Sequence, residues 1–133
     1  MNKYFRLTFI FIGVWIIASL INGVLSIVAF AISSKNVDME MAFCIPISFV
    51  FSVPFVGITW VVAMISAAND QKGESLYRIT LHASFFIGCA GAVFFTIAIS
   101  YWHDASSITI PIVIILSVVS SIIIFRTKIK ATQ

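Results

Sequence analysis

Residues 83–97, ASFFIGCAGAVFFTI, repeat the pattern of residues 18–32, ASLINGVLSIVAFAI, 65 positions further along the chain. When residues 12–61 are aligned with residues 77–126 at this offset, twelve positions are identical. They include one pair of glycines and one pair of prolines, Gly23/Gly88 and Pro46/Pro111. A repeat at a fixed offset predicts a helical hairpin that occurs twice in the chain. Chance matching between two apolar segments is the alternative.

The composition places the chain in a membrane. Hydrophobic residues make up 61% of the 133 residues and charged residues only 10%, whereas an ordinary soluble domain has roughly 25% charged residues. Four apolar runs reach about the 18 residues that mark a spanning helix; the expected spans are residues 7–33, 45–68, 77–101 and 107–125. The sequence therefore predicts an all-α, polytopic membrane protein of one domain, residues 1–133, whose four transmembrane helices form an up-down-up-down bundle.

The positive charges indicate the orientation of the spans. Seven of the eight lysine and arginine residues precede the first span, separate the second from the third, or follow the fourth, and only Lys35 lies elsewhere. Because cytoplasmic loops carry the excess of positive residues, both termini and the middle loop are expected in the cytoplasm, with the protein in the bacterial cytoplasmic membrane. The first apolar run exceeds the roughly 7–15 residues of a signal-peptide core, so we expect it to remain as an anchor.

Small residues four positions apart mark one face of the first and third spans. Ser19 and Gly23 form this face in the first span, and Ser84 and Gly88 form it in the third. Small residues let membrane helices approach closely, so we expect the first and third spans to cross there; a homodimer contact is the alternative. The full predicted packing or partner interface is Ser19, Asn22, Gly23, Ser84, Gly88 and Gly91.

Two residues within the spans need a specific explanation. Asn22 places an amide near the middle of the bilayer, where it is expected to find a hydrogen-bond partner across a helix interface; a pore-lining or ligand-binding amide is the alternative. Pro54 falls in the middle of the second span, where it removes a hydrogen bond and clashes with the preceding turn. We therefore expect a kink at Pro54, with Ser52 bonding to a freed carbonyl.

Residues with catalytic or metal-binding chemistry are scarce. The spans contain no acidic or basic residue at depth, which argues against ion-coupled transport and intramembrane acid catalysis. His82 and His103 are about 31 Å apart if one helix holds both, so they cannot share a metal within one protomer. Cys44 and Cys89 form neither a metal spacing nor a disulfide framework. We expect no catalytic residue, no cofactor, no metal and no nucleic-acid partner.

An interface without reactive groups indicates a function by contact. We expect a non-catalytic protein that binds another membrane protein laterally, as an accessory subunit, an assembly factor or an immunity protein against a membrane-acting toxin. The alternative is a homo-oligomeric channel or facilitator for a small solute, whose path would be lined by Asn22, Ser52, Pro54 and Thr59. An enzyme is a third hypothesis, and it requires a pocket that joins His82 to Tyr77 and Arg78.

Overall fold

The computed structural model describes residues 2–33, 44–99 and 109–132, and every element in these ranges is a helix. The helices are α1 (Lys3–Ser33), α2 (Cys44–Ala68), α3 (Gly73–Ile99), α4 (Thr109–Ile124) and α5 (Arg126–Lys130). By length and composition, α1, α2 and α3 can cross a membrane, and α4 adds a shorter apolar helix. The structure confirms the predicted all-helical chain and its membrane-type helices.

Two of the helices begin before the apolar runs that predicted them. α1 begins at Lys3 and α3 at Gly73, each four residues before the expected span. Hydropathy marks only the part of a helix that fits the hydrocarbon, whereas the hydrogen-bond ladder continues through polar turns at the surface. The expected end of the third span at 100–101, the start of the fourth at 107–108, and His103 lie outside the described residues.

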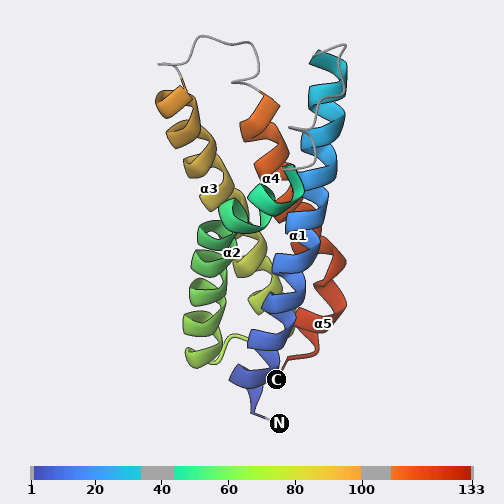
Figure 1. Cartoon of the computed structure of the whole chain (residues 1–133). Helices are drawn as coiled ribbons and strands as arrows, with labels where there is room; N and C mark the ends of the chain where they lie inside the picture. The colour runs from blue at the N-terminus through green and yellow to red at the C-terminus, as the bar shows by residue number, and fades with distance from the viewer. Residues whose placement is uncertain (1, 34–43, 100–108, 133) are drawn as a thin grey trace.

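Each long helix has two main neighbours. α1 packs against α2 and α4, and α3 packs against the same two helices, so α1 and α3 occupy diagonal positions. Both termini lie at the end of the molecule where α2 turns into α3 (Figure 1). The expectation that the first and third spans cross is therefore not met, because α2 and α4 lie between them.

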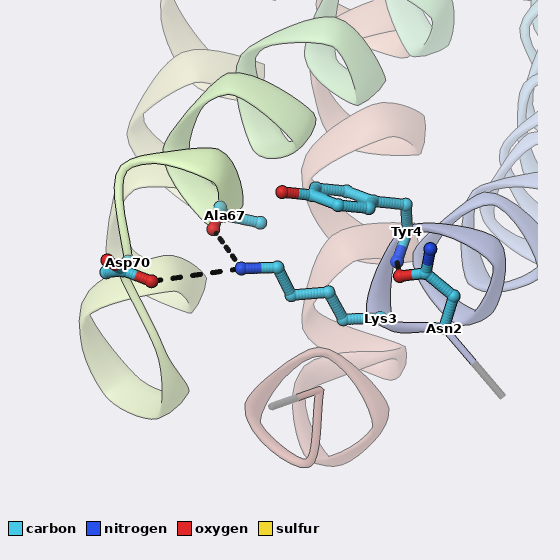
Figure 2. A network of polar contacts seen from close by, with 5 residues as sticks. All are labelled: Asn2, Lys3, Tyr4, Ala67 and Asp70. Atoms are coloured by element: carbon cyan, nitrogen blue, oxygen red, sulfur yellow. Dashed lines mark hydrogen bonds and ion pairs between the residues drawn. The ribbon is translucent and has the colours of Figure 1, made fainter.

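Lys3 holds the N-terminus to the turn between α2 and α3. Its Nζ donates a hydrogen bond to the Ala67 carbonyl at 2.9 Å and lies 3.9 Å from an Asp70 carboxylate oxygen (Figure 2). The turn itself places Asp70 and Gly73 at positive φ, 60° and 56°. Aspartate and glycine tolerate this left-handed conformation better than most residues, so the chain reverses here within a few residues.

The largest interior cluster lies towards this end of the molecule. Its members come from α1, α2, α3, α4 and α5, and the fully buried ones are Leu7, Val14, Ala18, Ala63, Leu76, Ile122 and Ile129. A second cluster joins Phe55 of α2 to Ile114 and Val118 of α4. The outer surface is also apolar, since every long helix exposes large hydrophobic side chains. An apolar surface of this extent suits lipid rather than water.

α2 changes direction along its length. Its first part lies across the molecule, and its later part runs along it towards the α2–α3 turn (Figure 1). Pro54 lies inside this helix. Since proline has no N–H, it cannot bond to the Val50 carbonyl one turn earlier. The change of direction places the early residues of α2 against α1.

Both prolines of the repeat lie in the first described turn of a helix. Pro46 and Pro111 are the third described residues of α2 and α4. Proline suits the first turn because its missing N–H would have no partner there.

The repeat does not hold for the packing register. Gly23 faces Ile45 of α2, whereas Gly88 faces Ile115 of α4. At the offset of the repeat, the counterpart of Ile45 is Ile110 rather than Ile115. The second hairpin is therefore shifted by five residues relative to the first.

Candidate functional site

A cluster of hydrogen bonds joins α1 to α2 inside the molecule. The hydroxyl oxygens of Ser19 and Ser52 lie 2.6 Å apart. The Ser19 hydroxyl donates to the Trp15 carbonyl at 2.7 Å, and Trp15 Nε1 donates to the Phe49 carbonyl at 3.0 Å. The Phe49 carbonyl also accepts the Ser52 hydroxyl at 3.3 Å, in the turn before Pro54. The small residue predicted to meet the third span is thus used in the contact between α1 and α2.

The three glycines of the predicted interface face neighbouring helices of the same chain. A Cβ atom on Gly23 would lie 3.1 Å from the Cα of Ile45, and one on Gly88 would lie 3.4 Å from the Cα of Ile115. A Cβ atom on Gly91 would lie 1.9 Å from the ring of Phe55. These glycines permit close approach of α1 to α2, of α3 to α4, and of α3 to α2.

The two remaining residues of the predicted interface are also buried. Ser84 is inaccessible, and its hydroxyl donates to the Leu81 carbonyl at 2.7 Å. Asn22 is 8% exposed, one turn beyond Ser19 on α1. Within the described ranges, no hydrogen bond reaches the Asn22 amide. The structure brings Ser19 and Gly23 against α2, and places Ser84 and Gly88 on α3, away from them.

Four further buried hydroxyls bond within their own helices. Thr59, Thr80, Ser117 and Ser121 each donate to a carbonyl three or four residues earlier, at distances of 2.7–2.9 Å. Such local bonds satisfy the donor without a partner from another helix. The residues proposed to line a solute path do not share one surface, because Ser52 and Thr59 are buried whereas Pro54 is exposed.

The residues of the enzyme hypothesis do not form a pocket. His82 is exposed, and its Nδ1 lies 2.6 Å from the Arg78 carbonyl in its own helix. Tyr77 is buried, and its ring faces Arg126 and Lys130 instead. In the described part of the chain, no group of three or more His, Cys, Asp or Glu residues is placed to hold a metal ion.

A concave site lies between α1 and α2. It has a volume of about 370 Å³, and its lining is Thr8, Phe11, Ile12, Trp15, Val53, Val56, Gly57 and Trp60. The only hydroxyl among these residues, on Thr8, donates to the Tyr4 carbonyl at 2.9 Å. Ile12 and Val53 are exposed, so the groove opens on the outer, apolar surface. We call it the α1–α2 groove.

Gly57 distinguishes this groove from the packed faces of the molecule. A Cβ atom on Gly57 would meet nothing within 4 Å, whereas each of the other five glycines has a neighbouring atom of the chain within that distance.

No family model, curated protein or solved structure matches the chain. Sequence reasoning missed Gly57. The available signal was the repeat, in which Gly57 stands where the second copy has the large apolar residue Ile122. The structure shows that Ile122 is fully buried.

The indole of Trp60 is the second unusual feature of the groove wall. Its Nε1 is buried and finds no hydrogen-bond partner within the described ranges, in contrast to the paired Nε1 of Trp15. An unpaired buried donor costs about 1–3 kcal/mol. Both tryptophans pack against the large interior cluster.

Proposed function

We propose that this chain is a non-catalytic membrane protein that binds a transmembrane helix of another membrane protein in the α1–α2 groove. The observation that supports this proposal is the open space at Gly57, in an apolar groove on the outer surface. Without a hydrophobic force between helices in lipid, association depends on close packing, and small residues make it possible. An accessory subunit, an assembly factor and an immunity protein would all use such a contact.

The proposal includes a specific arrangement in the membrane. α4 completes an up-down-up-down bundle of four spanning helices, and both termini lie in the cytoplasm of a bacterial cell. Two observations support this arrangement: the diagonal placement of α1 and α3, and the common position of the termini and the α2–α3 turn (Figure 1). The described part of α4 has 16 residues, about 24 Å of helix.

The chemistry of the groove favours a helix over a polar solute. Its walls are aliphatic and aromatic, and its one hydroxyl is already bonded within α1. A packed helix gains dispersion contacts along such walls. Binding that moves the Trp60 ring also gives its unpaired Nε1 access to an acceptor on the partner.

Site-specific photocrosslinking in native membranes tests the proposal. A photoreactive residue replaces Ile12 or Val53, which are 46% and 52% exposed at the groove, or Phe86 of α3, which is 68% exposed elsewhere. We expect both groove positions to capture the same polytopic membrane protein, with the crosslinked peptide in one of its transmembrane helices. The position at Phe86 should not capture it.

A matched pair of substitutions shows whether the groove itself is responsible. Gly57→Leu fills the open space and should abolish the adduct, while Ile58→Leu alters an adjacent exposed position and should leave it intact. Adducts with lipid alone, adducts with a second copy of the chain alone, or a hetero-adduct insensitive to Gly57→Leu would each reject a partner helix at this site. Self-adducts would favour the homo-oligomer.

A further inference from the structure

The end of the molecule that holds both termini carries a large positive excess. Seven lysine and arginine residues are described, and all lie near this end: in the first two turns of α1 and α3, in the α2–α3 turn and on α5. Asp70 and Glu74 are the only acidic side chains within the described ranges. This excess concerns a different part of the molecule from the α1–α2 groove.

α5 is docked against the start of α3. Ile129 is fully buried within the large interior cluster, and Lys130 forms an ion pair with Glu74. The charged groups of Arg126 and Lys130 each lie 5.4 Å from the centre of the Tyr77 ring, a distance at which cation and ring attract. α5 therefore has a fixed position, although it has only five residues.

The docking of α5 leaves cations without acidic partners. Glu74 is shared by Lys130 and by Arg78, whose Nε lies 3.5 Å from it. Arg126 and Lys128 are exposed, and neither forms an ion pair with another described residue. The corner between α3 and α5 thus has three cations near one carboxylate, Arg78, Arg126 and Lys130, and α5 carries Lys128 in addition.

Exposed apolar side chains adjoin these cations. Ile123 and Ile124, at the end of α4, are more than half exposed and directly precede Phe125 and Arg126. This order matches a phospholipid, whose charged headgroup lies next to its acyl chains. A free phosphate ion would gain nothing from the isoleucines.

We propose that an anionic phospholipid binds at this corner, with its phosphate against Arg126 and Lys128 and its acyl chains along Ile123 and Ile124. Charge complementarity selects the headgroup, since basic residues near the surface attract anionic lipids with about 1 kcal/mol each, or about fivefold in affinity. The docked position of α5, set by Ile129, keeps both exposed cations of this short helix at the α3–α5 corner.

Native mass spectrometry of the purified full-length chain tests this proposal. The detergent-solubilised protein is titrated with phosphatidylglycerol or with phosphatidylcholine of the same acyl chains. We expect phosphatidylglycerol to bind at least about tenfold more tightly, and Arg126→Gln or Lys128→Gln to weaken it about fivefold each. Arg6→Gln and Lys72→Gln remove the same charge from α1 and from the α2–α3 turn, and should change it by less than about twofold because neither side chain belongs to the proposed phosphate contact.

Ile129→Ser separates docking from charge. This substitution keeps every cation but removes the buried anchor of α5. It should weaken the binding of phosphatidylglycerol as much as the double Arg126→Gln/Lys128→Gln variant does. The helix content, measured by circular dichroism, should stay unchanged. Equal binding of the two lipids, equal losses in the control variants, or full displacement by inorganic phosphate would overturn the proposal. The groove crosslink should persist in Arg126→Gln, so failure at one site is distinguishable from failure at the other.

Discussion

Gly57 and Gly91 both lack a Cβ atom, but the space that this atom would occupy is open at Gly57 and filled at Gly91. At Gly91 a Cβ atom would overlap the ring of Phe55, which is buried against Ile114 and Val118. At Gly57 the same atom would enter open space. A glycine that permits contact within the chain can thus be distinguished from one that remains available to a partner.

The substitutions Gly91→Ala and Gly57→Ala should have opposite effects on stability. Overpacking at Gly91 is expected to lower the free energy of unfolding by about 1–3 kcal/mol. Gly57→Ala is expected to leave it unchanged or to raise it by up to about 1 kcal/mol, because alanine favours a helix more than glycine does. Thermal unfolding followed by circular dichroism in one detergent measures both. A loss at Gly57 as large as that at Gly91 would contradict the assigned packing.

At the scale of the element, the direction of α2 decides what its early residues contact. The Phe49 carbonyl and the Ser52 hydroxyl meet α1 through Trp15 and Ser19, and both precede Pro54. A straight α2 would carry these groups away from α1. The proline and the interhelical hydrogen bonds therefore support the same geometry.

Pro54→Ala tests how far the proline maintains this geometry. Spin labels at Ile47 and Val61, both exposed on α2, report its end-to-end length by double electron–electron resonance. We expect Pro54→Ala to lengthen the distance between the helix axes at these positions towards about 21 Å, the value for a straight helix. Val53→Ala serves as the control and should leave the distance unchanged. An unchanged distance in Pro54→Ala would assign the bend to the contacts with α1 alone.

At the scale of the whole molecule, the proposed orientation joins the charge pattern to the arrangement of helices. The N-terminus, the α2–α3 turn and α5 share one end (Figure 1), and this end holds all seven described cations. Positive residues are retained on the cytoplasmic side of a membrane. The shared end is therefore the one expected in the cytoplasm.

Cysteine labelling with an impermeant maleimide measures this orientation in cells. In a Cys44→Ser/Cys89→Ser background, Lys72→Cys in the α2–α3 turn should react only after the membrane is permeabilised. Asn36→Cys, in the expected outer loop and outside the described residues, should react in intact spheroplasts. The reverse pattern would refute the cytoplasmic location of both termini and would leave the helix contacts unaffected.

The sequence alone predicted those features that depend on local properties. Apolar runs predicted the helices, because a chain in hydrocarbon must bond its backbone internally. The sequence assigned Gly23, Gly88 and Gly91 to a packing or partner interface, and the structure places atoms of a neighbouring helix around each. Their partners could not be predicted, because small residues suit close approach to any helix.

Only the tertiary structure decided which faces meet. A helix that is apolar all round has no sequence periodicity to mark its inner side, so α1 was expected against α3 but packs on α2 and α4. The basic segment after α4 was interpreted through its role in orienting the chain, yet its buried Ile129 docks it against α3. The open site at Gly57 depends on the register between α1 and α2, which is set by contacts between residues far apart in sequence. Local patterns therefore determined the elements, and packing between distant segments determined both proposed binding sites.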